Sequence, residues 1–296
     1  MRSTDISGDR TATADSLSPR DFEQLRALVR AECGIHLAPE KRTMLEVRIR
    51  KRVRSLNLGS CSEYAAFLLS PAGRQREMRQ FIDVVTTNKT DFFRESRHFD
   101  FLVETALPTL AAQSGAGFDR PFLAWSAGCS TGEEPYTLAI VLSEYAGRNP
   151  GFRFRLLATD ISNRVLDHAR RAVYSEEAVE KIPPELRRKC LLRSRDPAAR
   201  VYRIAAGLRA TIEFRHLNFM DGDYHIAEPL DVIFCRNVLI YFERETQAAL
   251  LRRFSDRLRP GGYLFVGHSE TLHGMDVPLL PAGPTVYRRP DGADRR

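Results

Sequence analysis

Short apolar runs of strand length alternate with amphipathic stretches over the second half of the chain. Buried strands are predicted from Phe122 and at 152–160, 230–237 and 263–267, with a further helix at 245–258. After the first strand, Gly128 and Gly132 bracket a turn of small residues, and Pro135 stands in the first turn of a helix whose apolar body ends at Leu142. Strand, glycine turn and helix form the first half of a βαβ unit, which predicts an α/β fold with a doubly wound sheet.

The first part of the chain has helical patterning instead. Residues 1–18 are polar and aperiodic, so we expect a disordered tail there. Helices are expected at 22–33, 39–56, 62–69 and 74–85. The first of them follows the start signal Ser18-Pro19 and precedes Gly34, a typical stop. The pattern therefore predicts a small helical domain at 19–90.

The second predicted domain spans 91–296 and begins with a long helix at 96–113. Within it, Lys189–Phe214 is expected to form a small antiparallel β insertion, because β-prone pieces at 201–204 and 211–214 lie on either side of Gly207. The connector at 86–94 is unusually rich in side-chain donors and acceptors.

Charge adds a candidate docking surface. The formal net charge is +7, from 45 basic and 38 acidic residues. The helix at 39–56 carries seven basic residues: Lys41, Arg42, Arg48, Arg50, Lys51, Arg52 and Arg54. Such a run is either a solvated face or a docking surface for nucleic acid, an anionic membrane or an acidic protein. Aromatic residues are nearly absent from it, which counts against stacking of single-stranded nucleic acid.

Composition also indicates the cellular compartment. Five cysteines with no Cys-x-x-Cys pair indicate reduced thiols in a cytoplasmic protein. No apolar run approaches the roughly 18 residues of a membrane span, and no signal-peptide core follows Met1. We therefore expect no membrane insertion.

Acidic residues at the glycine turn narrow the ligand. Glu133 and Glu134 occupy the helix start, where a dinucleotide site would leave bare N–H groups for phosphate. Two carboxylates suit a ligand with a cationic end, such as S-adenosylmethionine, although they could also only complement the helix dipole. Asp160 ends the second strand, where such folds bind ribose hydroxyls, and it could equally be the N-cap of a helix at 162–172.

Six stretches together resemble one family. They are Thr-Asn-x-Thr-x-Phe-Phe-Arg at 87–94, Trp-Ser-Ala-Gly-Cys-Ser-Thr-Gly-Glu-Glu-Pro-Tyr at 125–136, Ala-Thr-Asp at 158–160, Leu-Asn-Phe at 217–219, Phe-Cys-Arg-Asn-Val-Leu-Ile-Tyr-Phe at 234–242 and Gly-His-Ser-Glu at 267–270. Each is weak alone, but six in this order are specific. The chain resembles the CheR-type chemotaxis receptor methyltransferases from about residue 20 to 289. The resemblance implies a Rossmann-like domain that binds S-adenosylmethionine, with a small β insertion, after an all-helical domain.

The resemblance also implies an activity, namely methylation of glutamate side chains of chemoreceptors to γ-glutamyl methyl esters, with S-adenosylhomocysteine as the second product. It implies a cofactor site made of Asn88, Thr90, Arg94, Glu134, Asp160, Asn218, Phe219, Cys235 and Arg236. In this site Glu134 takes the methionine ammonium and Asp160 the ribose hydroxyls. Asn218 and Phe219 flank the adenine. Arg94 and Tyr241 are the implied catalytic residues, facing the substrate carboxylate and the methyl group.

These residue types suit the chemistry. A glutamate carboxylate has an ordinary pKa of about 4.3 and is ionised at neutral pH, so the reaction needs alignment rather than a general base. No metal is required, and His268 and His273 are expected to be structural. The partners expected are cytoplasmic domains of methyl-accepting receptors, docked by the basic helix 39–56, with the enzyme a monomer. Some members of the family also bind a receptor tail as an added strand at a glycine-containing turn. The turn at 193–200 has no glycine, so no such tether is expected here.

The sequence leaves three other classes of function open. A nucleic-acid methyltransferase could use the basic helix to hold phosphate, with strongly salt-dependent binding. A non-catalytic adaptor could retain the cofactor pocket without turnover. A nicotinamide dehydrogenase is disfavoured by the two carboxylates at the glycine turn.

Overall fold

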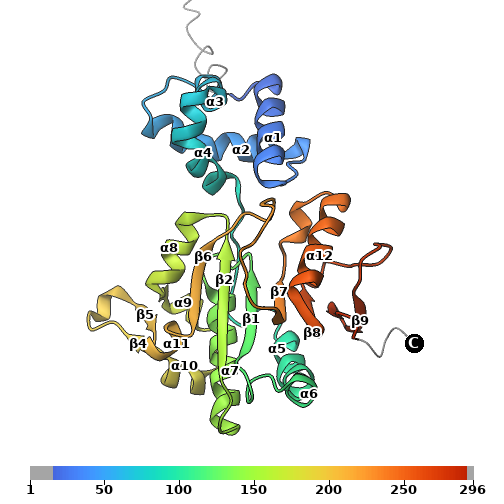
Figure 1. Cartoon of the computed structure of the whole chain (residues 1–296). Helices are drawn as coiled ribbons and strands as arrows, with labels where there is room; N and C mark the ends of the chain where they lie inside the picture. Colours follow the sequence, from blue (N-terminus) through green and yellow to red (C-terminus); the bar gives the residue numbers. More distant parts are fainter. Residues whose placement is uncertain (1–15, 292–296) are drawn as a thin grey trace, which may run out of the picture. The chain divides into compact units, whose positions relative to one another are not determined.

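The computed structural model describes residues 16–291, which fall into two compact units with their boundary between Thr87 and Asn88 (Figure 1). The boundary lies three residues before the predicted one, because Asn88 belongs to the second unit, where its carbonyl accepts a hydrogen bond from Ser130 Oγ at 2.9 Å. Most of the predicted tail, residues 1–15, and the C-terminal residues 292–296 lie outside the described residues. The last residues of the predicted tail are ordered, since Leu17 is buried.

The first unit contains only helices among its described residues. They are α1 (Pro19–Cys33), the short 3-10 helix η1 (Pro39–Lys41), α2 (Arg42–Ser55), α3 (Cys61–Leu69) and α4 (Pro71–Val85). Serine side chains cap three of the four α-helices: Ser18 accepts from Asp21 N–H, Ser60 from Glu63 N–H and Ser70 from Gly73 N–H. Gly34 ends α1 with a positive φ of 71°. The four predicted helices are confirmed to within a few residues at each end.

The basic residues of α2 divide into two sets. Arg48 points inward and donates to the last carbonyl groups of α4, reaching Val85 O at 2.7 Å. Arg52 forms a two-pronged ion pair with the buried Glu77, at 2.6 and 2.9 Å. Exposed positions on α2 include Arg42, Val47, Lys51 and Arg54. Two of the seven basic residues, Arg48 and Arg52, are therefore used inside the unit, which the sequence pattern alone did not indicate.

The second unit is built on a seven-stranded sheet in the order β6-β2-β1-β7-β8-β10-β9 (Figure 1). Its strands are β1 (Phe122–Ala127), β2 (Phe154–Asp160), β6 (Ile212–His216), β7 (Leu230–Cys235), β8 (Leu258–Val266), β9 (Leu280–Gly283) and β10 (Val286–Arg288). The first five in spatial order are parallel, and β10 and β9 are antiparallel additions. This is the doubly wound sheet that the alternating pattern predicts.

Helices precede the first strand of this sheet and follow several of the others. They are α5 (Arg97–Phe101), the π-helical turn η2 (Leu102–Ala106), α6 (Leu107–Ser114), α7 (Glu133–Arg148), α8 (Asn163–Arg171), the 3-10 turn η4 (Leu239–Tyr241) and α12 (Arg244–Arg257). The run from α5 to α6 confirms the long helix predicted at 96–113. Every residue of β1 and β7 is buried, as expected for central parallel strands covered on both faces. Among residues 16–291, no helix has the length and apolar character to cross a bilayer.

The small β unit differs from its prediction. It is a three-stranded antiparallel sheet of β3 (Val173–Ser175), β5 (Val201–Ile204) and β4 (Leu191–Arg193), in the order β3-β5-β4. It is joined by α9 (Glu176–Val179), α10 (Pro184–Cys190), the 3-10 turn η3 (Pro197–Ala199) and α11 (Ala206–Arg209). Figure 1 shows this group at the left of the main sheet.

Two boundaries of the predicted insertion, 189–214, are therefore wrong. The unit starts earlier, with β3, and the predicted strand piece at 211–214 lies in β6, which pairs in parallel with β2 in the main sheet. The residues of a short apolar strand do not indicate which strand it pairs with. The local pattern therefore could not assign this strand to a sheet. The glycine-free turn at 193–200 forms nevertheless, because Arg200 adopts a positive φ of 43°.

Candidate cofactor and active site

Three strands of the parallel sheet deliver the predicted site residues to one edge. β1 pairs with β2 so that Ala127 lies beside Thr159, and with β7 so that Ser126 lies beside Phe234. The loops that follow these strands therefore leave the sheet at the same carboxyl edge. That edge is where doubly wound folds bind their ligands.

The glycine turn after β1 has no room for side chains at two positions. Gly128 and Gly132 have φ of 85° and 102°. A Cβ on Gly128 would lie 2.6 Å from Val238 Cγ2, and one on Gly132 would lie 2.7 Å from the hydroxyl of Tyr174. The turn is thus fixed by steric closeness as well as by backbone conformation.

Asp160 closes this turn from the end of β2. Its Oδ2 accepts from Ser130 N–H and its Oδ1 from Ser162 N–H, both at 2.9 Å. The helix that follows is capped by Ser162, whose hydroxyl accepts from Val165 N–H. The alternative that Asp160 is the N-cap is therefore wrong. A carboxylate oxygen has spare lone pairs, so the Asp160 carboxylate retains acceptor capacity at this edge.

Two side chains bind the Glu134 carboxylate, one from β1 and one from the residue that follows β7. Ser126 Oγ donates to its Oε1 and Arg236 Nε to its Oε2, each at 2.7 Å. Both charged side chains are buried. Glu134 is thus more than a complement to the helix dipole, because an arginine from the end of β7 neutralises it.

Glu133 is set apart from this pair. Its Oε2 accepts from Thr131 Oγ1 at 2.6 Å. Burial raises the pKa of its carboxyl above the ordinary value. Of the two adjacent acids, Glu134 is the one in contact with the other predicted site residues.

The segment from Asn88 to Glu95 runs along the same edge. Ser130 Oγ ties down the carbonyl of Asn88, and Phe93 N–H donates to Thr137 Oγ1 in α7 at 3.1 Å. Arg236 Nη1 donates to the carbonyl of Arg94 at 2.7 Å. The structure thus brings Arg94, Glu134 and Arg236 together, and it places Asn88 and Thr90 on the segment that carries Arg94.

Backbone strain concentrates around this edge. Positive φ occurs at Phe93 and Glu95, on either side of Arg94, and at Ser130, Asn237 and Thr285. Non-glycine residues adopt this conformation only where the surroundings hold them, and such residues gather at functional sites. The side chain of Arg94 is presented from such a strained segment, with its Nη1 donating to Lys89 O at 3.1 Å.

Asn218 and Phe219 follow β6 and reach the same edge. Leu217 N–H donates to Asp160 O at 3.0 Å, so the two residues begin directly beside the end of β2. The ring of Phe219 packs against Trp125 and Phe254. Its side chain is therefore part of the core, and a ligand contact at this position falls to the backbone.

The end of β7 carries the remaining predicted residues. The Cys235 side chain is fully buried, and burial raises the pKa of its thiol well above the ordinary value. Tyr241 is half-buried in η4. The loop before it is held by Glu270, whose Oε2 accepts from Asn237 N–H at 2.8 Å and from Gly267 N–H at 2.6 Å.

Sequence reasoning missed several members of this arrangement: Ser126, Thr137, His98, Glu95 and Glu270. Glu270 lies within the Gly-His-Ser-Glu stretch, and Glu95 and His98 directly follow the 87–94 stretch, so their positions were marked without a role. Apart from Ser126, which donates to Glu134 eight residues away, each has a partner more than 30 residues away, and this explains why no local pattern revealed them.

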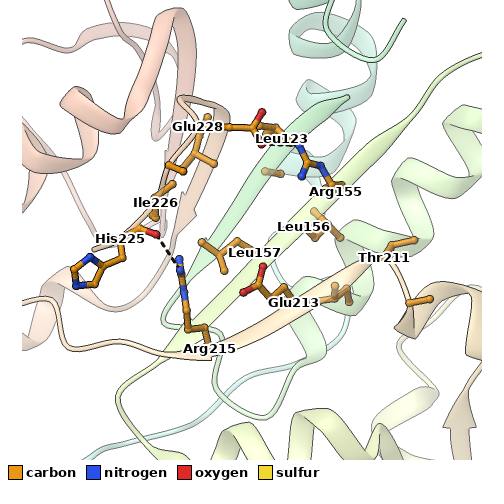
Figure 2. Close-up of a pocket in the computed structure, with 15 residues that line it drawn as sticks. Leu123, Arg155, Leu156, Leu157, Thr211, Glu213, Arg215, His225, Ile226 and Glu228 are labelled. Carbon is orange, nitrogen blue, oxygen red and sulfur yellow. Dashed lines mark hydrogen bonds and ion pairs between the residues drawn. The ribbon is translucent and has the colours of Figure 1, made fainter. Parts of the chain in front are cut away.

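A separate hollow lies over the first halves of β1, β2 and β6 (Figure 2). It is lined by aliphatic residues such as Leu157 and Ile226 and by charged groups such as Arg155 and Arg215. Arg155 pairs with Glu228, and Arg215 donates to His225 O. None of the predicted site residues lines this hollow, so it is distinct from the carboxyl edge.

Comparison with known proteins identifies the family. The family model for the CheR methyltransferase SAM-binding domain matches residues 88–282, and the model for the CheR all-alpha domain matches residues 20–86. The chain is 41% identical over 268 residues to chemotaxis protein methyltransferase 2 of Pseudomonas aeruginosa, covering 90% of this chain and 92% of that protein. It is 37% identical over 272 residues to the chemotaxis protein methyltransferase of Escherichia coli, covering 92% and 91%.

Similarity to solved structures is much weaker. The CcbJ methyltransferase of Streptomyces caelestis matches with a TM-score of 0.32 and 18% identity, over 56% of this chain and 51% of that chain, and adds nothing to the assignment. The two family models together extend from residue 20 to residue 282 and match the two units. The chain therefore belongs to the CheR family of methyltransferases that bind S-adenosylmethionine.

Proposed function

We propose that this protein transfers a methyl group from S-adenosylmethionine to glutamate side chains in the cytoplasmic domains of chemoreceptors. The products are a glutamyl methyl ester and S-adenosylhomocysteine. The observation that carries the proposal is the pair of buried carboxylates, Asp160 and Glu134, held at one sheet edge in a chain of this family.

The residues present fit the cofactor. Gly128 and Gly132 give the turn after β1 its positive-φ conformation, and Asp160 is fixed beside that turn by two backbone N–H groups. A carboxylate so fixed can accept from two adjacent hydroxyls, as ribose offers. The Glu134 carboxylate can accept hydrogen bonds from an ammonium group. Its ion pair with Arg236 leaves acceptor capacity on both oxygens.

The other residues of the proposed cofactor site have supporting roles. Asn88, Thr90 and Arg94 close over the cofactor from their segment. Asn218 and the backbone of Phe219 flank the adenine. The backbone of Cys235, together with Arg236, forms the floor at the end of β7.

The proposed reaction needs no general base from the protein. When bound, the cofactor supplies an electrophilic methyl group on a sulfonium whose sulfur leaves as a neutral thioether. A receptor glutamate is already ionised at neutral pH, so one of its oxygens can form the new bond without a general base. Arg94 orients that carboxylate through its fixed donors, and Tyr241 hydrogen-bonds it or lines the methyl path. Alignment of the two reactants is then the main source of acceleration. No metal takes part in this scheme.

The receptor docks on the outward face of α2. Lys51 and Arg54 are exposed there beside Val47, whose side chain is 59% exposed. A basic face around an apolar residue suits an acidic, glutamate-bearing helix. The enzyme acts as a monomer in the cytoplasm, without inserting into the membrane.

A labelling experiment tests the proposal. The protein is incubated with S-adenosylmethionine carrying a radioactive methyl group and with receptor cytoplasmic domains, and the labelled receptor is then treated with mild base. We expect label that base releases as methanol, because an ester is base-labile. Label in added RNA, stable to base, would support a nucleic-acid methyltransferase. Cofactor binding without any transfer would support the non-catalytic adaptor.

A further inference from the structure

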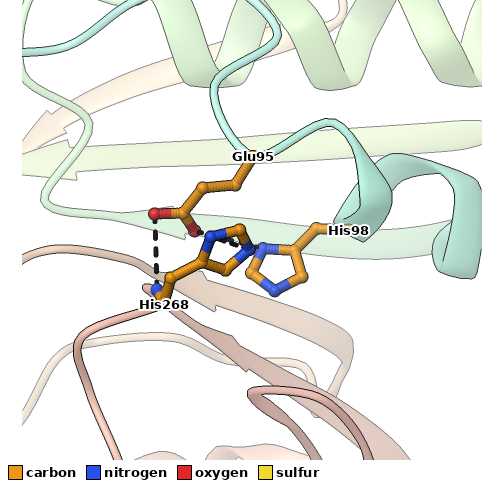
Figure 3. Close-up of side chains that lie close together, drawn as sticks. All are labelled: Glu95, His98 and His268. Atoms are coloured by element: carbon orange, nitrogen blue, oxygen red, sulfur yellow. Dashed lines mark hydrogen bonds and ion pairs between the residues drawn. The ribbon is translucent and has the colours of Figure 1, made fainter.

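Arg236 links Glu134 to a second group of polar side chains, of which His98 is buried, Glu95 partly buried and His268 exposed. Its Nη1 lies 3.2 Å from His98 Nδ1 and 3.6 Å from Glu95 Oε2. His268 completes the group, with its Nε2 4.0 Å from Glu95 Oε2 (Figure 3). His98 is buried, at the start of the helix that follows the Arg94 segment.

The spacing of this group resembles a metal site, but its chemistry does not. One ligand atom each from Glu95, His98 and His268 lies within 4.8 Å of the others. A bound cation would need the lone pairs of His98 Nδ1 and Glu95 Oε2 that face the Arg236 guanidinium. That guanidinium is permanently charged and is already fixed by its ion pair with Glu134. The group is therefore built around an arginine.

The contacts of His98 determine its protonation state. Nδ1 lies 3.2 Å from Arg236 Nη1 and 3.5 Å from Glu95 Oε2. Arginine can only donate, so the shorter contact assigns Nδ1 as an acceptor without a proton. The proton then lies on Nε2, which donates to Thr285 Oγ1 at 2.8 Å, and that hydroxyl donates to Pro284 O at 2.8 Å. Burial, reinforced by the charge of Arg236, lowers the pKa of His98 to about 4. The imidazole is neutral, and its tautomer is defined from both sides.

The guanidinium of Arg236 is held on several sides. Nε meets Glu134, and Nη1 meets the carbonyl of Arg94 and His98 Nδ1. Its plane lies over the ring of Phe99, with the centroid 5.2 Å from Cζ. Among these contacts, His98 is the side-chain acceptor for Nη1, whereas Glu134 is the side-chain acceptor for Nε.

We propose that His98 is a positioning residue for cofactor binding. Its unprotonated Nδ1 fixes Arg236 in the orientation that sets the Glu134 carboxylate. The proposal rests on the proposed function, in which Glu134 binds the ammonium group of the cofactor. His98 touches neither cofactor nor substrate in this scheme.

Two near-isosteric substitutions separate this role from simple packing. Asparagine at 98 places its Oδ1 where Nδ1 is and keeps the acceptor for Arg236. Glutamine places its amide nitrogen near Nε2, which keeps the donor to Thr285 and loses the acceptor. The affinity for S-adenosylhomocysteine is measured by calorimetric titration for H98N, H98Q and wild type, with the melting temperature of each.

We expect H98Q to raise the Kd about tenfold, as loss of one hydrogen bond to a charged group predicts, and H98N to stay within about threefold of wild type. Equal affinities in the two variants, or weaker binding by H98N, would overturn the proposal. Failure of the wild type to bind would instead refute the proposed function.

Nitrogen chemical shifts of the wild-type imidazole give a test that needs no variant. We expect an unprotonated Nδ1 and a protonated Nε2 for His98 between pH 6 and 8. A protonated Nδ1 in that range would overturn the proposal, even if H98Q failed to fold.

Discussion

Replacement of Asp160 by asparagine is the sharpest test of the cofactor site, because it removes charge at nearly constant shape. In the native protein both carboxylate oxygens accept backbone N–H bonds, from Ser130 and Ser162, at 2.9 Å. Asparagine keeps one of these bonds and turns an NH₂ group toward the other donor. The buried donor left without an acceptor costs about 1–3 kcal/mol of folding free energy.

The free energy of cofactor binding should fall by an amount similar to the loss in folding free energy. A hydrogen bond to a charged acceptor contributes about 1.5–3 kcal/mol, and the proposed ribose contact uses the carboxylate in this way. Each 1.4 kcal/mol is a factor of ten, so we expect the Kd for S-adenosylhomocysteine to rise about 10- to 100-fold. The melting temperature should fall by about 2–12 °C, because each 1 kcal/mol lowers it by about 2–4 °C in a unit of this size.

Calorimetric titration measures the affinity, and Asp167→Asn provides the matched control. Asp167 lies on α8 and pairs only at the surface with Arg170, its side chain being 63% exposed. The control makes the same change in net charge away from the site, so its Kd should equal that of wild type. A folded Asp160→Asn variant with wild-type affinity would remove Asp160 from the cofactor site. An equal loss in both variants would show that net charge alone is responsible.

Four further predictions concern catalysis, docking, stability and tethering. Arg94→Ala should lower kcat about 10- to 100-fold and the cofactor affinity by less, with poor rescue by lysine; equal losses in kcat and affinity would make Arg94 only a cofactor contact. Lys51→Glu combined with Arg54→Glu should raise the receptor KM and flatten its salt dependence, whereas wild-type kinetics would return α2 to a merely solvated face. Because burial lowers the pKa of His98 to about 4, the unfolded chain takes up a proton near pH 6.5 that the native protein does not, and stability is lost as pH falls. Denaturant unfolding should therefore show wild type losing about 2 kcal/mol relative to H98N between pH 7.5 and 5, and parallel curves would contradict the buried neutral imidazole. Since the turn at 193–200 has no glycine, methylation of a receptor with and without its terminal residues should proceed at similar rates, and a many-fold loss on truncation would restore the tether.

The folded structure decides which basic residues of α2 are suitable for charge reversal. From charge pattern alone, Arg48 and Arg52 are as suitable for reversal as their neighbours. In the folded unit, Arg48 caps α4 and Arg52 neutralises the buried Glu77. Reversing them would leave buried groups unpaired and destabilise the unit, with the docking question unanswered. Lys51 and Arg54 are the informative positions.

Features that depend on residues close together in the chain could be predicted from the sequence. Periodicity and capping residues located the helices of the first unit, since these signals repeat within a few residues along the chain. Glycines at 128 and 132 indicated the turn, because their φ values exclude most side chains. Asp160 and Glu134 were singled out by their places at a strand end and a helix start. The ordered motifs were sufficient to indicate the family.

Only the tertiary structure decided which distant groups meet. The partner of Glu134 is Arg236, 102 residues away, and the acceptor that fixes Arg236 is His98. The strand at 212–216 joins the main sheet instead of the small insertion. Each of these pairings depends on which strands lie side by side and in what register. That choice minimises the free energy of the whole fold, and no local stretch of sequence encodes it.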